Sequence, residues 1–187
     1  NLPMKERTKI FYTVSVSILR ETFESKLPVT MDKELFERIF NLVTASTRFL
    51  QQGGSLKSLA KLISHDYQTY SHCVHVFVYT SAIMQTFGVD EEKLTQIGLG
   101  AMLHDIGKSL IPKEVLNKTS SLTIKERTLM ESHPVKGVAI CSQMPLTQEA
   151  VNLILFHHEK MDGSGYPAGL AGDAIPLSVK AAALADV

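Results

Sequence analysis

The seven histidines of this 187-residue chain are unevenly distributed, because all of them lie between residues 65 and 158. One of them, His104, directly precedes Asp105 at the end of an apolar run, in the segment LHDIGK at residues 103–108. An imidazole nitrogen beside a carboxylate can bind one divalent ion and bridge to a second. A His-Asp pair is weak evidence by itself, since a capping or surface role accounts for it equally well.

Further candidate ligands lie on other expected helices or at their ends. These residues are His72, His133, His157, His158 and Asp186. Metal sites in helical bundles are built from inward-facing side chains on several helices. A single histidine of this kind is more often a core residue satisfied by a backbone carbonyl. It is a poor explanation that each of this many residues is hydrogen-bonded in the core independently, so the sequence indicates a metal site.

Helical spacing places two of these histidines on apolar stripes. One stripe consists of Val151, Ile154, Leu155 and His158. The other consists of His72, Val76, Tyr79 and Ile83. We therefore expect His72 and His158 to face the interior, whereas His65 and His75 are expected to be ordinary surface or packing residues.

The composition excludes several classes of protein. The chain is 44% hydrophobic and 20% charged, as is usual for soluble globular proteins, and it has no uninterrupted apolar stretch long enough to span a membrane. Nineteen basic residues balance nineteen acidic ones, so the chain has no overall positive electrostatic field to hold the phosphate backbone of a long nucleic acid. Cys73 and Cys141 lack the spacing of a disulfide scaffold or a cysteine zinc cluster. We expect a cytoplasmic piece of a longer protein, whose parent can still be membrane-tethered.

The sequence predicts an all-α fold, because apolar residues recur at three- and four-residue spacing and strand signals are scarce. Helices are expected over residues 4–23, 32–50, 66–87, 90–104, 123–133, from 134 onward, 147–158 and 177–187, with a short one near 55. Asp90 and Thr147 have cap positions, and Thr123 with Glu126 has the capping-box spacing. Residues 161–176 are rich in glycine and proline and are expected to form a loop.

In order and spacing, these motifs resemble the HD-GYP family. The matching segments are His72, HDIGK at 104–108, HP at 133–134, HHE at 157–159, DGSGYP at 162–167 and AD at 185–186. The resemblance implies an all-α HD-superfamily helical bundle and hydrolysis of a cyclic dinucleotide, cyclic di-GMP or 3',3'-cyclic GMP-AMP, to the linear form. It divides the chain into an N-terminal helical support or connector, residues 1–63, and an HD-GYP catalytic domain, residues 64–187, that is incomplete at its C-terminus.

The resemblance also assigns roles to residues. The basic HD ligand set is matched by His72, His104, Asp105 and Asp186, and the extra ligands for a second ion are matched by His133, His157 and His158. Asp105 would bridge the two ions, which can be iron, manganese, nickel, cobalt or zinc. Lys108 matches a lysine that contacts substrate phosphate, although a solvated lysine at a helix end is the plainer interpretation.

The glycine-rich loop is expected to form a rigid wall of the site and, by the same resemblance, a docking surface for diguanylate cyclase domains. Its residues are Gly163, Gly165, Tyr166 and Pro167. Glu159 is expected either to orient a ligand histidine or to lie on the surface. A homodimer is a further expected assembly, and no partner of the nucleic-acid or membrane kind is expected for this segment.

Water is the expected nucleophile, because the sequence offers no Ser-His-Asp arrangement, activated cysteine or P-loop. The resemblance also covers a three-metal variant of the family, which has a glutamate one helical turn before the first histidine. This chain has the neutral amide of Gln68 at that position. We therefore expect two ions. Two alternatives stay open: an HD phosphohydrolase acting on a nucleoside triphosphate or an alarmone, and a degenerate HD module that only binds nucleotide or scaffolds signalling partners.

Overall fold

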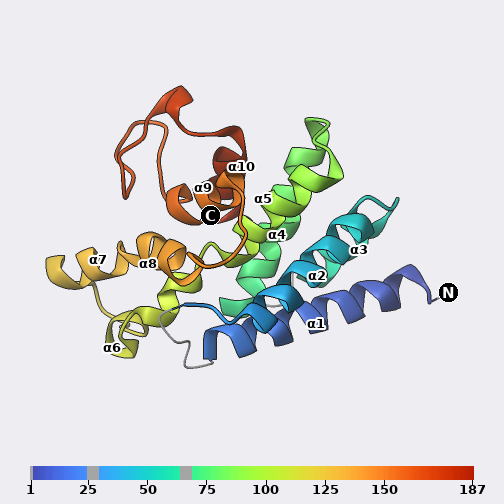
Figure 1. The fold of residues 1–187 in the computed structure, drawn as a ribbon, viewed down its shortest axis with the longest axis horizontal. Coiled ribbons are helices and arrows are strands. Elements are labelled where there is room, and N and C mark those ends of the chain that lie inside the picture. Colours follow the sequence, from blue (N-terminus) through green and yellow to red (C-terminus); the bar gives the residue numbers. More distant parts are fainter. Residues whose placement is uncertain (1, 25–29, 64–68) are drawn as a thin grey trace.

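The computed structural model describes residues 2–24, 30–63 and 69–187. These residues form α-helices, two short 3₁₀ helices and one isolated antiparallel bridge between Asp162 and Ala171 (Figure 1). The predicted all-α fold is therefore confirmed. His65 and Gln68 lie outside the described residues. None of the described helices is both long and apolar enough to cross a membrane.

Three N-terminal helices lie along one side of the molecule (Figure 1). They are α1 (Met4–Glu24), α2 (Lys33–Leu50) and α3 (Ser55–Ile63). The start of α2 is fixed by Asp32, whose Oδ1 accepts a hydrogen bond from the Glu34 amide at 2.6 Å. These boundaries agree with the predicted ones within a residue or two.

The central helix is α5 (Glu91–Leu103), in which every residue from Ile97 to Leu103 is buried. It packs against α4 (Thr69–Thr86), α2 and α9 (Gln148–Phe156), and α10 (Leu177–Ala185) packs against both α4 and α9. Asp90 caps α5 as predicted, since its Oδ1 accepts from the Lys93 amide at 2.8 Å. Because α5 is covered by its neighbours, the residues at its C-terminal end lie in the interior.

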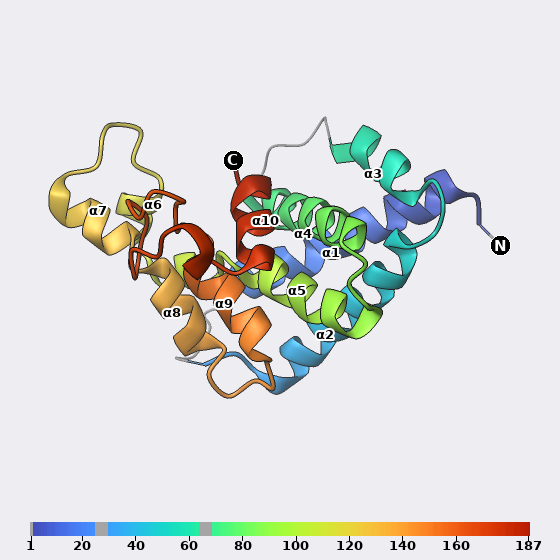
Figure 2. The ribbon, with the colours of Figure 1, turned by 90° about the horizontal axis from the view of Figure 1, so that it is seen from above.

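The remaining elements are short and lie at the end of the molecule away from α3 (Figure 2). They are the 3₁₀ helix η1 (Ile106–Leu110), α6 (Lys113–Leu116), α7 (Ile124–Met130), α8 (His133–Ile140) and the 3₁₀ helix η2 (Gly172–Ala174). The capping box of Thr123 and Glu126 is present, and Pro134 lies in the first turn of α8, as predicted. Neither η1 nor α6 was predicted, because both are too short for a periodic pattern.

Thr147 holds the N-cap position of α9 but makes no capping bond. Its hydroxyl donates instead to Oε1 of Gln96 at 3.2 Å. The predicted cap position is therefore correct, whereas a bond to α9 is replaced by a contact with α5. This contact links the start of α9 to the central helix.

Two glycines allow helices to approach the α5–η1 segment closely. A Cβ atom on Gly100 would lie 2.7 Å from Cβ of Leu153 in α9. A Cβ atom on Gly107 would lie only 1.9 Å from the carbonyl oxygen of His133, at the start of α8. No larger residue fits at these distances, so both glycines set the positions of the helices that carry the later histidines.

One hydrophobic core extends through the described helices. It includes Leu19 of α1, Val43 of α2, Phe77 of α4, Leu99 of α5 and Ile154 of α9. The N-terminal helices therefore pack directly on the helices that carry the histidines. The division at residue 63 into a connector and a catalytic domain stays a prediction.

Candidate metal centre

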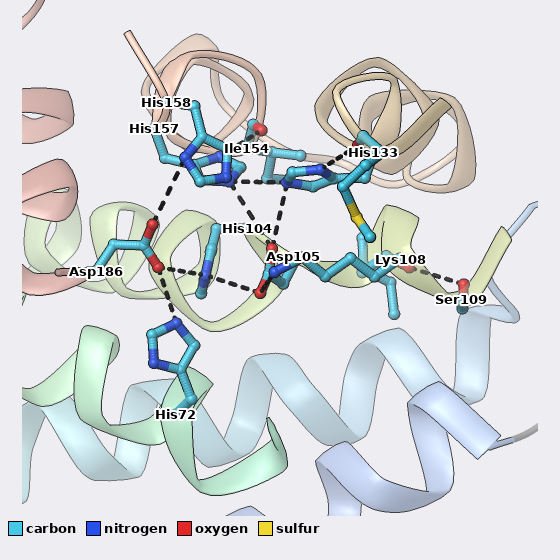
Figure 3. A network of polar contacts seen from close by, with 12 residues as sticks. His72, His104, Asp105, Lys108, Ser109, His133, Ile154, His157, His158 and Asp186 are labelled. Atoms are coloured by element: carbon cyan, nitrogen blue, oxygen red, sulfur yellow. Dashed lines mark hydrogen bonds and ion pairs between the residues drawn. The ribbon is translucent and has the colours of Figure 1, made fainter. Parts of the chain in front are cut away.

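The His104–Asp105 pair lies where α5 ends, and each residue is only 1% exposed. Five further candidate ligands surround the pair (Figure 3). They are His72 on α4, His133 on α8, His157 and His158 at the end of α9, and Asp186 at the end of α10. The structure thus brings all seven predicted ligands together from five helices.

The ligand atoms form two groups, and the atoms within each group lie within 4.8 Å of one another. The larger group consists of Asp105, His133, His157 and His158. The other consists of His72, His104 and Asp186. Nitrogen and carboxylate donors of this kind suit first-row transition ions and zinc.

Asp105 faces histidines of both groups with different oxygen atoms. Its Oδ1 is 3.3 Å from Nε2 of His133 and 3.8 Å from Nε2 of His157. Its Oδ2 is 3.4 Å from Nε2 of His104. The carboxylate has the arrangement that a bridging ligand requires.

Asp186 spans the groups in the same way. Its Oδ1 is 2.8 Å from Nε2 of His72 and 3.3 Å from Nε2 of His104. Its Oδ2 is 3.7 Å from Nδ1 of His158. Two carboxylates therefore lie between the same two sets of imidazoles.

Backbone carbonyls orient three of the imidazoles. Nδ1 of His104 and of His133 each lie 2.8 Å from a carbonyl oxygen three residues earlier, and Nδ1 of His157 lies 3.0 Å from that of Ile154. A carbonyl oxygen only accepts hydrogen bonds, so each Nδ1 carries a proton. The Nε2 atom of each ring consequently faces the other candidate ligands, as is usual for histidines that bind metals.

The close approach of two such nitrogens fits a shared ion. The Nε2 atoms of His133 and His157 are 3.1 Å apart. Two nitrogens bound to one ion at 2.0–2.1 Å lie about 2.8–3.0 Å apart at octahedral angles and about 3.3–3.4 Å apart at tetrahedral ones. In addition, Nε2 of His104 and Oδ1 of Asp105 are buried and have no hydrogen-bond partner among the described residues. The residues therefore fit divalent ions.

Burial and charge act in opposite directions on the pKa values of the cluster. Burial lowers the pKa of His158 to about 4 and also lowers that of His157. Burial alone would lower the pKa of His104 as well, but Asp105 and Asp186 outweigh it and raise the pKa to about 10. Burial raises the pKa of both carboxyls, and hydrogen bonds and charge from the histidines more than offset it, so that both values lie below the usual range. A proton on His104 therefore competes with any dication for this cluster.

Lys108 lies on η1, beside the cluster. Its Nζ donates to Oδ2 of Asp105 at 2.6 Å, and its side chain is about one quarter exposed. The predicted placement of this lysine next to the candidate ligands agrees with the structure. Its contact with substrate phosphate stays a prediction.

The apolar stripe of α9 differs from the predicted one. Its buried residues are Ala150, Leu153, Ile154 and His157. His158 is partly exposed, so the prediction that it shares the buried stripe is wrong. Because α9 contacts α5 through Leu153, which lies over Gly100, the buried face is rotated by one residue. On α4, Tyr79 is likewise exposed rather than buried.

Cys73, which was not predicted to be a ligand, lies next to the site. Its buried sulfur lies within 4.8 Å of the ligand atoms of His104 and Asp105. A single cysteine next to a histidine carries no spacing signal, so the sequence could not have identified it. His75, in contrast, packs against α1, where its Nε2 is 3.1 Å from the hydroxyl of Tyr12.

The glycine-rich loop folds back on the end of α9. The ring of Tyr166 lies 4.8 Å from that of His158, centroid to centroid, with 30° between the planes. A Cβ atom on Gly165 would lie 2.5 Å from the carbonyl oxygen of His158, so only glycine allows this approach. Gly163 is needed for a different reason, because its φ of 77° lies in the left-handed region that favours glycine. The loop therefore forms one side of the cluster.

Glu159 differs from both expectations stated for it. It is 4% exposed, so it is not a surface residue. Its carboxylate binds the backbone of the loop and not a ligand histidine, because it accepts from the amides of Ala168, Gly169 and Leu170 at 2.7, 3.1 and 2.9 Å. The sequence carries no local signal for this contact, because the nearest of the three amides is nine residues from Glu159.

Comparison with known proteins identifies the family. The family model described as "HD domain" matches residues 38–186. The chain belongs to the HD domain family. This HD domain is 36% identical over 145 residues to a cyclic di-GMP phosphodiesterase of Pseudomonas aeruginosa, covering 76% of this chain and 34% of that protein. It is 38% identical over 122 residues to 3'3'-cGAMP-specific phosphodiesterase 2 of Vibrio cholerae, covering 64% of this chain and 23% of that protein.

A solved structure supports the fold of this HD domain. An HDG"Y"P protein from Bdellovibrio bacteriovorus superposes with a TM-score of 0.78 at 22% identity, covering 98% of this chain and 60% of that one. Together with the family model and the named relatives, this structure confirms the predicted HD-GYP resemblance. The chain spans less than half the length of the curated relatives that it matches.

Proposed function

We propose that this HD domain is a metal-dependent phosphodiesterase that hydrolyses a cyclic dinucleotide to the linear form. The observation that carries the proposal is the pair of carboxylates, Asp105 and Asp186, that each face two sets of imidazoles. The names of the relatives supply the substrate class, because they are called phosphodiesterases of cyclic di-GMP or of 3'3'-cGAMP. Of the two substrates, we propose cyclic di-GMP first and 3',3'-cyclic GMP-AMP second.

The HD domain depends on divalent metal, and we propose two ions. Asp105, His133, His157 and His158 would hold one, and His72, His104 and Asp186 would hold the other, with Asp105 shared. When bound, the ions polarise phosphoryl oxygens and lower the pKa of water. Iron, manganese, nickel, cobalt and zinc are all compatible with this donor set. Two ions are expected because the amide of Gln68 would bring no negative charge to offset a third.

Lys108 and Asp105 are the proposed catalytic residues. Lys108 carries a fixed positive charge beside Asp105, where negative charge on the phosphoryl group would accumulate. Asp105 orients this lysine and supplies one oxygen to each set of imidazoles. Gly163, Gly165, Tyr166 and Pro167 are proposed to form the wall against which the substrate lies, since Tyr166 packs on His158.

A nucleotide-binding or scaffold module without activity has less support. A degenerate site would lack some of the donors, whereas here every predicted ligand is present and oriented inward. Docking of diguanylate cyclase domains on the glycine-rich loop, homodimer formation and a cytoplasmic location of the parent protein stay predictions.

The test is hydrolysis of a panel of cyclic dinucleotides by the full-length protein loaded in turn with each metal. We expect a linear dinucleotide product and two equivalents of metal by elemental analysis. Protein that holds metal but hydrolyses no member of the panel would favour the scaffold alternative. Three ions within bonding distance of one another would contradict the proposed count, and Gln68→Glu should favour the third.

A further inference from the structure

His158 and Glu159 bind the backbone of the glycine-rich loop on the two sides of Tyr166. On the N-terminal side, the Tyr166 amide donates to the carbonyl oxygen of His158 at 3.3 Å. On the C-terminal side, the Glu159 carboxylate accepts from three successive amides, those of residues 168–170. Tyr166 therefore lies between two attachments to adjacent residues.

The Glu159 carboxylate makes three hydrogen bonds to the backbone of the loop. One Glu159 oxygen accepts from Ala168 and Gly169, and the other accepts from Leu170. The group is buried, and hydrogen bonds to an ionised acceptor are about twice as strong as neutral ones. Without the carboxylate, three neighbouring backbone amides would lose their acceptor at once.

Other contacts close the base of the loop and do not reach its tip. The Gly163 amide donates to the carbonyl oxygen of Lys160 at 2.9 Å, and the Gly172 amide donates to that of Met161 at 3.0 Å. Asp162 accepts from the amide and the hydroxyl of Ser164 at 2.9 and 2.7 Å. These contacts stabilise residues 160–164 and 171–172, but none of them reaches residues 166–170.

We propose that Glu159 is a positioning residue that fixes Tyr166 against the candidate ligand His158. Through the three amides it sets the conformation of the segment that follows Tyr166, and thereby holds the Tyr166 ring on the imidazole. It contacts neither substrate nor metal. The inference rests on the proposed function only where it concerns substrate, since the attachment itself is a property of the fold.

The test compares two carboxylate-to-amide changes in the same loop, Glu159→Gln and the control Asp162→Asn. Each variant is made in the full-length protein and loaded with metal. Hydrogen exchange is measured at the amides of residues 168–170, together with metal content. For Glu159→Gln we expect exchange at these amides to accelerate roughly tenfold or more. Metal content should be unchanged, and exchange at residues 168–170 in Asp162→Asn should match that of the original protein.

Activity gives a second readout. With a cyclic dinucleotide as substrate, Glu159→Gln should raise KM more than it lowers kcat, because the wall of the site moves while the ligands stay. Unchanged exchange at residues 168–170 would overturn the proposal. Loss of metal equal to that of His158→Ala would overturn it too, since Glu159 would then support a ligand histidine.

Two further comparisons keep the result interpretable. If Glu159→Gln does not fold by far-UV circular dichroism, Glu159→Asp keeps the charge but shortens the side chain, and it should still accelerate exchange at residues 168–170. Normal exchange in that variant would again contradict the proposal. If the original protein hydrolyses no cyclic dinucleotide, the proposed function fails, whereas the exchange data still decide the role of Glu159.

Discussion

The Nε2 atoms of His133 and His157 lie 3.1 Å apart, although the residues belong to different helices and are 24 positions apart in the sequence. Each ring donates its Nδ1 proton to a backbone carbonyl, so two nitrogen lone pairs face each other. Two facing lone pairs repel each other unless a cation or a proton lies between them. The folded protein should consequently bind metal much better than the unfolded chain.

We therefore expect metal to raise the stability of the protein. Free metal at a hundred times its Kd should add about 2.7 kcal/mol, provided that the unfolded chain does not bind it. Thermal unfolding with a chelator and with added metal measures the difference. His157→Asn should reduce the metal-dependent shift, and an equal Tm with and without metal would count against the site.

Replacing the central pair should remove metal and activity without unfolding the helices. His104→Ala or Asp105→Ala is expected to abolish hydrolysis and lower metal content, because Asp105 faces both sets of imidazoles. Elemental analysis, activity and far-UV circular dichroism test this together. His75→Ala is the control, since His75 contacts Tyr12 on α1. Full activity in a folded Asp105→Ala variant would refute the two-metal interpretation.

Lys108→Ala should impair turnover more than metal binding. The Lys108 ammonium group lies 2.6 Å from Asp105 but has no lone pair for an ion while it is charged. Loss of a fixed charge near a developing anion costs about a hundredfold or more in kcat. Metal content and kcat measured on the same preparation separate the effects, and parallel loss of both would show that the lysine supports the ligands.

Gly107→Ala should disturb the site from its backbone. The added methyl group would lie 1.9 Å from the His133 carbonyl oxygen, so α8 must move and carry His133 with it. Overpacking of this kind destabilises proteins by about 1–3 kcal/mol. The free energy of unfolding, measured with denaturant, and the metal content should both fall. Gly53→Ala, where nothing lies within 4 Å, should change neither, and a Gly107→Ala protein with full stability would contradict the packing argument.

Metal affinity should increase with pH. In the absence of metal the pKa of His104 is raised to about 10, so the ring is protonated at neutral pH and must lose a proton to bind an ion. His158, whose pKa is lowered to about 4, is already neutral. We expect the apparent affinity to rise about tenfold per pH unit between roughly pH 6 and 8, with one proton released per site. Calorimetry in buffers of different ionisation enthalpy measures both quantities, and an affinity that does not vary with pH would contradict the role of His104.

Local signals in the sequence determined most of the helices and the set of candidate ligands. Asp90 and the pair Thr123 and Glu126 cap helices as predicted, because capping involves residues two or three positions apart. The seven ligand positions followed from residue types and their order along the chain. No distant contact was needed for either inference.

Only the tertiary structure decided how these residues meet. The approach of α9 to α5 at Gly100 turned His157, and not His158, into the buried residue, since helical spacing alone does not fix the rotation of a helix. The partner of Glu159 and the proximity of Cys73 also depend on where separate segments lie in space. Oδ2 of Asp105 faces the neighbouring His104 at the end of α5, whereas Oδ1 faces His133 and His157 because α8 and α9 converge on it (Figure 3). That convergence is set by long-range packing rather than by local sequence.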